Sequence, residues 1–400
     1  MAMKQTQTKL FDFSDAGLDF STVSTNLYLD RFKKMLALGY NEQTVSTVAV
    51  VGNQVTFIYG GAHGYAAGRV LKVNSGGLAA IYNGEFWIDS VTTNTVTMTI
   101  DDAPLSVTGG FTTKIAPLGW DLMYETGQVQ IYKFKSPDET DLYVRMLFPS
   151  ASGYGFLYPC IGKSYDPSTG FIDDAYAYAG NKDILAVTNT TTNLKFIMHN
   201  YNGVAPFANY TYAQGVAQGL GRAMVMGSKY HFGLLNNMGS SDGGAISAIL
   251  PVNMLDYPQL DYPLVIGTSS GGTTTGATSA RFFCGNNELT LLWSNSINTS
   301  RYTNTSASSY LPSSLDNFNT TAAFPLVLRD YATQQVLGMT AGGAYHCGYA
   351  AGSTPTRTAN TSPSLTTDID FSHDLIVHYI GNSSASMFLA FPLEEIKYGD

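Results

Sequence analysis

Residues 62–100 read AHGYAAGRVLKVNSGGLAAIYNGEFWIDSVTTNTVTMTI, and this stretch decides the predicted fold. Two runs of alternating apolar and polar residues, Arg69–Val73 and Glu85–Ser90, stand on either side of a glycine-rich link. A third run, Thr95–Ile100, follows a Thr-Asn turn. Alternation with period two between clusters of Gly, Asn and Ser predicts short β-strands joined by tight turns. The stretch therefore predicts part of a small β-barrel.

The neighbouring sequence extends this β pattern on both sides. Val45–Val51 and Gln54–Tyr59 flank Gly52-Asn53, which is typical of a two-residue hairpin turn. Phe111–Ile115 adds a last strand, so we expect a closed sheet of about five or six short strands, a usual size. The predicted barrel covers residues 42–116.

An arm and one helix are predicted before the barrel. Residues 1–23 are polar without a period and indicate an extended arm. From Thr25 to Leu38 the apolar residues recur at i, i+4, i+7 and i+8, as in an amphipathic helix. Ser24 or Thr25 can cap its start, and Gly39 can end it in the left-handed conformation. Arm and helix together form the segment 1–41.

The remainder, residues 117–400, is predicted to be an antiparallel β-sandwich with long loops. The peptide Ala116-Pro117-Leu118-Gly119-Trp120 breaks the strand pattern and marks the boundary. Long helices, which a parallel α/β sheet requires, are not indicated after residue 38. Loops as long as 267–280 and 294–323 are usually functional or ordered by a partner. The strand-like runs are Gln128–Lys135, Asp141–Phe148, Ile184–Val187, Leu194–His199, Ala223–Met226, Ala245–Leu250, Leu264–Ile266, Arg281–Cys284, Leu289–Trp293, Pro325–Leu328, Asp374–Tyr379 and Met387–Phe391. The expected class is all-β.

Composition argues against several functions. Charged residues make up 13% of the 400 residues, against roughly 25% in an average globular protein, and the net charge is −9. A nucleic-acid binder needs clustered Lys and Arg to neutralise phosphates, so we expect no nucleic-acid partner. No run approaches 18 apolar residues, so no membrane insertion is expected. Three cysteines without a C-x-x-C spacing indicate a reducing compartment, and no signal peptide is evident.

Three sequence patterns suggest chemistry, but none has the context that the chemistry requires. Residues 267–271 match G-x-S-x-G, yet the Gly- and Thr-rich continuation is a poor helix start. Lys163 lies in a P-loop-like tetrapeptide, but Leu157 stands where a glycine is required, which favours an ordinary loop lysine. The densest group of acidic and imidazole side chains favours a solvated edge strand over a hard-cation site. This group is Asp368, Asp370, His373 and Asp374. We therefore predict no catalytic residue, no cofactor and no metal site.

A turn of the barrel contains the histidine of the opening stretch. His63 stands between Ala62 and Gly64, where its ring can bond a neighbouring backbone group and fix the turn. Catalysis is the alternative, but a lone histidine is no evidence of a mechanism. We predict His63, Gly64, Asn83 and Gly84 to be turn residues of the barrel.

Several short motifs follow one another in a fixed order. They are Phe13-Ser14-Asp15-Ala16-Gly17, Leu36-Ala37-Leu38-Gly39-Tyr40, Ala62-His63-Gly64, Ala116-Pro117-Leu118-Gly119-Trp120, Val129–Phe134 and Leu142–Met146. This order resembles a family of structural proteins of tailed-bacteriophage virions, over residues 10–200. The family supplies no catalytic residues to carry over to this chain.

The resemblance implies a non-enzymatic virion component that is assembled in the host cytoplasm. We favour a tail-associated position, at the baseplate, tail tip or fibre attachment, over a capsid decoration or head-fibre protein. Other virion proteins and further copies of the chain are the expected partners, reached through the arm and helix. The expected docking residues are Phe11, Phe13, Tyr28, Phe32, Met35 and Leu36. Removal of residues 1–23 is then expected to leave a folded chain that no longer enters particles.

Two further functions remain as alternatives. Loops rich in Tyr, Trp and Asn within residues 200–360 suit a carbohydrate-binding module that recognises a host surface glycan. A glycan hydrolase needs a pair of carboxylates flanking the scissile bond, and no such pair can be located in the sequence.

Overall fold

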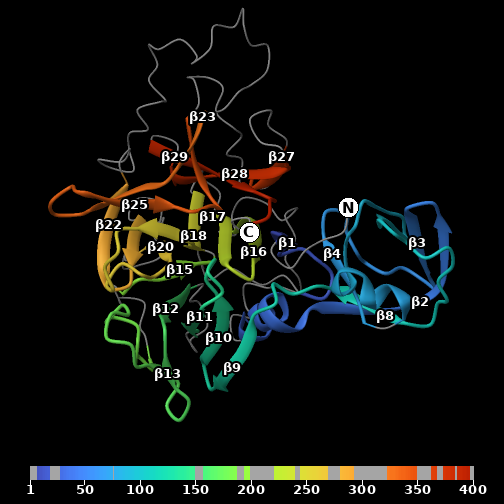
Figure 1. The fold of residues 1–400 in the computed structure, drawn as a ribbon, viewed down its shortest axis with the longest axis horizontal. Helices are drawn as coiled ribbons and strands as arrows, with labels where there is room; N and C mark the ends of the chain where they lie inside the picture. The colour runs from blue at the N-terminus through green and yellow to red at the C-terminus, as the bar shows by residue number, and fades with distance from the viewer. Residues whose placement is uncertain are drawn as a thin grey trace, which may run out of the picture.

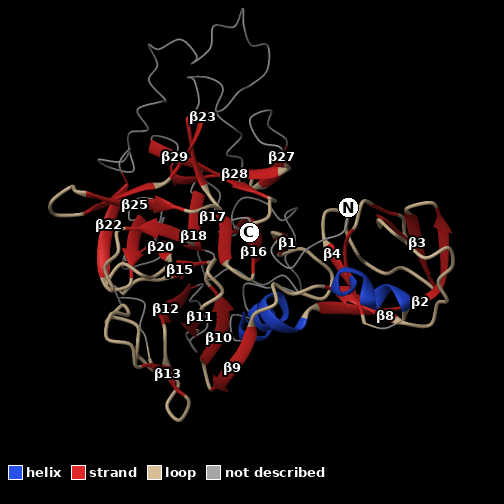
Figure 2. Ribbon diagram, in the orientation of Figure 1, coloured by secondary structure: helices blue, strands red, loops and turns tan. Residues whose placement is uncertain are grey.

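The protein is all-β and its sheets are antiparallel, which confirms the predicted fold class (Figures 1 and 2). In the computed structural model, the described residues are 7–18, 28–74, 76–148, 156–186, 193–198, 220–238, 244–268, 280–291, 322–348, 362–366, 373–382 and 385–396.

A seven-stranded sheet contains the stretch that opened the sequence analysis. Its strands, in the order in which they pair, are β5 (Glu85–Trp87), β4 (Val70–Val73), β8 (Thr112–Ile115), β2 (Tyr40–Val51), β3 (Gln54–Tyr59), β7 (Thr95–Thr99) and β6 (Ser90–Val91). The alternation is visible in β3, where Val55, Phe57 and Tyr59 are buried and the residues between them are not. The predicted strands of this region are therefore confirmed, with one more strand than expected.

The two edge strands of this sheet are consecutive pieces of chain. β5 pairs with β4, and β6 pairs with β7. Between them, the Ile88 N–H donates to the Arg69 carbonyl at 2.9 Å and the Asp89 N–H donates to the Thr97 carbonyl at 3.0 Å. The chain thus crosses from one edge to the other, and the sheet closes on itself as a small barrel.

The helix before this sheet begins as α1 (Tyr28–Lys33) and continues as the π-helix η2 (Lys34–Leu38). Gly39 ends it with φ +77°, and its N–H donates to the Lys34 carbonyl at 2.8 Å. A Cβ at Gly39 would overlap the Ile115 carbonyl oxygen, so the position requires glycine for space as well as for φ. The predicted helix is confirmed over residues 28–38 and ends at Gly39 as expected, but with ψ 174° this glycine is not in the predicted left-handed helical conformation. The predicted cap, Ser24 or Thr25, lies outside the described residues.

The peptide 116–120 fastens the end of this helix. The N–H groups of Leu118, Gly119 and Trp120 donate to the carbonyls of Met35 and Leu36 at 2.9–3.1 Å. These carbonyls lie in the last turn of the helix, where partners within the helix are missing. The Trp120 indole is buried, stacks on Phe134 at 4.8 Å and donates from Nε1 to the Ser228 carbonyl at 2.9 Å. The peptide is therefore a joint between the helix and the strands that follow it (Figure 2).

The described part of the predicted arm, residues 7–18, packs against the chain itself, while docking of the arm onto another protein stays a prediction. Residues Lys9–Asp12 form β1, which pairs with β16 (Leu220–Ser228), Lys9 opposite Gly227. Asp15, just beyond this strand, accepts two hydrogen bonds from the Arg69 guanidinium at 2.8 and 3.0 Å. The segment 7–18 therefore contacts both the closed barrel and the larger sheet, between which it lies in Figure 1.

The rest of the described chain forms further antiparallel sheets. A five-stranded sheet contains β15 (Phe196–Ile197), β12 (Phe156–Gly162), β11 (Asp141–Leu147), β10 (Val129–Lys135) and β9 (Asp121–Thr126), in that order. β13 (Tyr165–Asp166) and β14 (Phe171–Ile172) form a small ribbon. With β1 and β16, the largest sheet contains β17 (His231–Met238), β18 (Gly244–Leu250), β19 (Val252–Met254), β20 (Leu264–Thr268), β21 (Ala280–Cys284), β22 (Asn287–Leu291), β23 (Ala322–Pro325), β24 (Val327–Asp330), β25 (Val336–Thr340), β26 (Tyr345–Gly348), β27 (Ser364–Thr366), β28 (Leu375–Asn382) and β29 (Ala385–Pro392).

Most strand-like runs of the sequence fall on these strands, with three exceptions. The run Pro325–Leu328 is divided between β23 and β24, which Leu326 separates. Residues 184–186 are not a strand, and the run predicted over Leu194–His199 shrinks to β15. The predicted segments 1–41, 42–116 and 117–400 share part of their core. One apolar cluster includes Phe32 of the helix, Phe57 of the barrel and Phe232 of the largest sheet.

Candidate functional site

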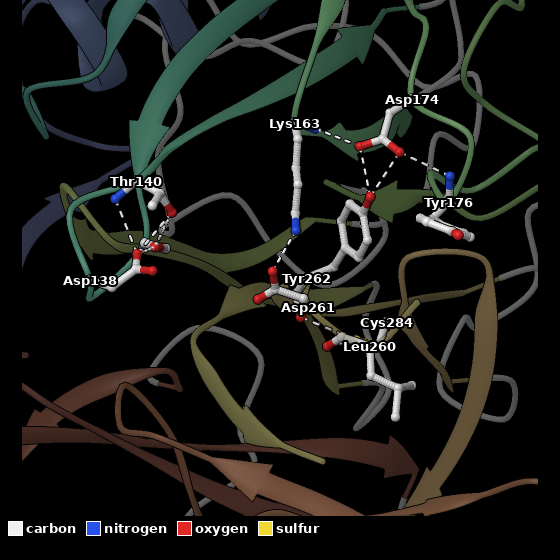
Figure 3. Close-up of polar contacts among 10 residues, drawn as sticks. Asp138, Thr140, Lys163, Asp174, Tyr176, Leu260, Asp261, Tyr262 and Cys284 are labelled. Atoms are coloured by element: carbon white, nitrogen blue, oxygen red, sulfur yellow. Dashed lines mark hydrogen bonds and ion pairs between the residues drawn. The ribbon is translucent and has the colours of Figure 1, made fainter. Parts of the chain in front are cut away.

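A cavity of about 360 Å³ opens between two parts of the chain that are far apart in the sequence. One wall is the turn between β10 and β11, residues 136–140, and the other is the segment 251–263 that leads from β18 through β19 to β20. Lys163, directly after β12, reaches into the space between them (Figure 3). Pro251 and Pro263 bound the second wall, because a proline cannot donate to the ladder of a central strand.

Lys163 is held both by its backbone and by the end of its side chain. Its backbone N–H donates to Asp174 Oδ2 at 2.7 Å, while its ammonium group forms an ion pair with Asp261. The ammonium also lies 5.1 Å from the centre of the Tyr262 ring. These contacts fix a positive charge on the wall of the cavity (Figure 3).

Asp174 supports this arrangement from behind. The Tyr262 hydroxyl donates to both of its carboxylate oxygens, at 2.8 and 2.7 Å, and the Tyr176 N–H donates at 2.9 Å. Burial alone would raise the pKa of Asp174, but the N–H groups of Lys163 and Tyr176 and the Tyr262 hydroxyl bring it below its ordinary value. Asp174 is therefore a charged, fully bonded carboxylate that positions the wall.

The opposite wall presents a second carboxylate. Asp138 Oδ1 accepts hydrogen bonds from the Thr140 N–H and hydroxyl, at 3.1 and 2.8 Å, and from Ser136. The Ser136 hydroxyl is the main reason that the pKa of Asp138 lies below its ordinary value. Within the described residues Oδ2 has no hydrogen-bond partner, so one oxygen remains available to a ligand.

A buried thiol fixes the turn beneath the cavity and has no sign of nucleophilic activation. Cys284 Sγ lies 3.1 Å from the carbonyls of Leu260 and Tyr262. Burial raises the pKa of this thiol to about 12, so it stays protonated at neutral pH. Its role is to hold the segment that carries Tyr262 (Figure 3).

The six residues that were expected to dock a partner lie in the core of the chain instead. All six side chains (Phe11, Phe13, Tyr28, Phe32, Met35 and Leu36) are buried in the core of the chain. Phe32 shows the reason, because its ring packs against Phe148 at 5.4 Å and Phe232 at 6.2 Å. The apolar face of the helix thus covers the chain's own sheets, and we assign these residues to the core.

The predicted turn residues lie in two connections of the barrel: His63 and Gly64 in the link after β3, and Asn83 and Gly84 at the end of the 3-10 helix η3 (Gly77–Gly84). His63 is buried, accepts the Tyr65 N–H on Nδ1 at 2.9 Å, and has Nε2 3.1 Å from the Thr95 carbonyl, which is the turn-fixing role expected from the sequence. Gly64 has φ +73°, Asn83 φ +57° and Gly84 φ +67°. A Cβ at Gly84 would lie 2.6 Å from the Val73 carbonyl oxygen, so this turn requires glycine.

Most of the other sequence candidates lie outside the part of the chain that the structure describes. Ser269 of the G-x-S-x-G pattern, Asp368 and Asp370 lie outside the described residues, as do 269–279 and 292–321 of the long loops. His373 and Asp374 are exposed. In the part of the chain that the structure describes, no group of three or more His, Cys, Asp or Glu side chains could hold a metal ion. No helix within these ranges is long and apolar enough to cross a membrane.

The cavity was not among the sequence-based candidates, although the sequence carries a signal for it. Residues 256–263 read DYPQLDYP, a tandem repeat of Asp-Tyr-Pro that the strand patterns pass over. Comparisons with known proteins add nothing to this picture, since the chain matches no protein-family model and no curated protein sequence.

Proposed function

We propose that this chain is a non-enzymatic structural component of a tailed-bacteriophage virion, attached to the tail at the baseplate, tail tip or fibre attachment. The observation that supports the proposal best is what the resembling motifs do in the fold. Ala116-Pro117-Leu118-Gly119-Trp120 is a joint that holds the helix end, and its Trp120 bonds Ser228 in the largest sheet. The motif therefore fixes the helix and the largest sheet relative to each other, as a structural subunit requires.

Other buried polar groups also serve the fold, which fits a structural role. The Arg69 guanidinium binds the Asp15 carboxylate with two hydrogen bonds, and the Tyr40 hydroxyl donates to the same carboxylate at 2.8 Å. Such bidentate pairs fix geometry as well as adding energy.

The proposed partners are other virion proteins and further copies of the chain, joined during assembly in the host cytoplasm. Since the large apolar side chains of segment 7–18 (Leu10, Phe11, Phe13 and Leu18) are buried, we expect contacts with these partners to use other surfaces. Val51, beside the β2–β3 turn, is 78% exposed, and Leu105, in the loop after β7, is 98% exposed.

Labelling of purified particles tests this proposal. A tag at the C-terminus, detected with gold-conjugated antibody in electron micrographs, should label the tail. Label on the capsid shell would favour a capsid decoration or head-fibre protein over a tail component. Absence of the chain from purified particles by mass spectrometry would overturn the virion proposal.

A further inference from the structure

We propose that the cavity between the β10–β11 turn and the segment 251–263 binds a neutral saccharide. Its volume of about 360 Å³ lies within the range of roughly 300–1,000 Å³ that is usual for small-molecule sites. The lining combines an exposed aromatic ring, hydrogen-bond acceptors from both walls and one ammonium group.

The Asp-Tyr-Pro repeat supplies both an anchor and a free aromatic ring. Tyr262 of the second copy is 4% exposed and bonded to Asp174. Tyr257 of the first copy is 57% exposed and lines the cavity. Its hydroxyl has no hydrogen-bond partner within the described residues. Tyr262 is engaged in holding the fold, whereas the exposed ring of Tyr257 can stack against the C–H face of a sugar. Tyrosine suits this contact because it combines an apolar ring with a polar hydroxyl.

The polar groups of the lining match hydroxyl groups better than charged ones. Asp138 keeps one carboxylate oxygen unused, and Asp256 has no hydrogen-bond or ion-pair partner in the described chain. Lys163 places an ammonium, shared with Asp261, among these acceptors. A hydroxyl both donates to a carboxylate and accepts from an ammonium, so a sugar satisfies the two kinds of group together.

The charges of the cavity lining favour a neutral saccharide over an acidic one. Three carboxylates, Asp138, Asp256 and Asp261, line the cavity against the one cation of Lys163. An acidic sugar would meet a net negative lining, whereas the hydroxyl groups of a neutral sugar can donate to these carboxylates and accept from the Lys163 ammonium. The exposed ring of Tyr257 offers a surface for the C–H face of a neutral pyranose beside these groups.

Saturation-transfer NMR on the purified full chain tests the proposal. The probes are glucose, galactose, mannose and N-acetylglucosamine, with glucuronic acid as the anionic probe and spermidine as the cationic probe. We expect saturation transfer to at least one neutral sugar and none to glucuronic acid. Binding of spermidine alone, or of no neutral sugar, would overturn the proposal.

Two matched tyrosines locate the site. Tyr257→Ala should weaken binding of the responding sugar about tenfold, the loss expected for one stacked ring. Tyr331→Ala removes a tyrosine of equal exposure, 59%, that does not line the cavity, and should leave binding unchanged. Asp256→Asn tests the acceptor wall with little change in shape, and should also weaken binding. Equal affinity in the wild type and Tyr257→Ala would place binding elsewhere and overturn the assignment. Because these measurements use the isolated chain, their outcome is independent of the virion labelling.

Discussion

Lys9 and Glu85 form a buried ion pair, with Lys9 Nζ 2.7 Å from Glu85 Oε2 and both side chains less than a tenth exposed. Lys9 lies on β1 in the largest sheet, and Glu85 begins β5, where the barrel closes. The same ammonium donates to the Pro117 carbonyl at 2.6 Å. Burial lowers the pKa of Lys9, and the negative charge of Glu85 opposes this shift. One side chain therefore connects the first strand, the barrel and the helix joint.

Removing one member of this pair should be costly. We expect Lys9→Met or Glu85→Gln to lower the free energy of unfolding by about 3–5 kcal/mol, because the other buried charge loses its main partner. Lys9→Met combined with Glu85→Leu should cost less than the sum of the single changes. Urea unfolding followed by tryptophan fluorescence measures all of these variants.

An exposed ion pair provides the control. Lys133 and Asp121 lie 3.1 Å apart with side chains 27% and 64% exposed. Lys133→Met should change the free energy of unfolding by less than about 1 kcal/mol. If the loss of unfolding free energy in the double variant equals the sum of the losses in the two single variants, Lys9 and Glu85 are not coupled.

Deletion of residues 1–23, which removes β1, should now prevent folding, the opposite of the sequence-based expectation.

Trp120 should contribute through packing more than through its hydrogen bond. Trp120→Phe keeps an aromatic ring against Phe134 but removes the donor to the Ser228 carbonyl, for an expected loss of about 1–3 kcal/mol. Trp120→Ala also leaves a cavity and should cost about 3–5 kcal/mol. Differential scanning calorimetry compares the two variants. Equal losses would mean that the hydrogen bond, and not the ring, carries the contribution.

Arg145 holds the segment that carries Asp174. It is fully buried, and its guanidinium donates to the carbonyls of Gly170 at 2.8 Å, Asn181 at 3.1 Å and Ile184. In Arg145→Lys a single ammonium group replaces the planar guanidinium, whose N–H groups point in several directions. Most of these carbonyls therefore lose their hydrogen-bond donor. We expect faster proteolytic cleavage within residues 163–186 and weaker sugar binding. Unchanged cleavage would show that the loop is held by other contacts.

The stability of the protein should fall in mild acid because of buried histidines. Burial lowers the pKa of His231 to about 3 and that of His346 and His378 to about 4, against about 6.5 in the unfolded chain. Below pH 6.5 the unfolded chain binds protons that the folded chain does not bind, so stability is lost as the pH falls from about 6.5 towards 4. At pH 5 each of these histidines should cost about 2 kcal/mol relative to neutral pH.

A pair of histidine variants checks this prediction by urea unfolding at pH 7 and pH 5. His378 is buried, with Nε2 2.9 Å from the Asn236 carbonyl, so His378→Gln should reduce the difference between the two pH values. His373→Gln replaces an exposed histidine and should leave the difference unchanged. An unaltered difference in His378→Gln would assign the acid sensitivity to other groups.

The alternation of apolar and polar residues predicted the strands of the barrel well but missed some strands of the other sheets. The β2–β3 hairpin depends on a two-residue turn and on alternation, both of which are local. β12 contains Pro159, which breaks a local strand pattern. The proline is tolerated because β15 pairs only with Phe156 and Leu157, so that among the described residues no strand pairs with Pro159 on that side.

Buried polar residues explain the other omissions. β17 contains Asn236, whose side chain donates to the Met198 carbonyl at 2.9 Å, 38 residues away. A polar residue in a strand is predicted to face water unless its distant partner is known. The candidate cavity has the same origin, since its walls at 136–140 and 251–263 meet only in the folded chain.

The pairing of β1 with β16 has a consequence for the order of folding during synthesis. Lys9 lies opposite Gly227, which is 218 residues later in the chain. At a translation rate of about 5–20 residues per second, β1 waits roughly 10–40 s for its partner strand. Glu85 emerges much earlier, so the barrel and its contact with Lys9 are expected to form first. β1 would then complete its sheet long after its own synthesis, with the barrel holding it in place until β16 arrives.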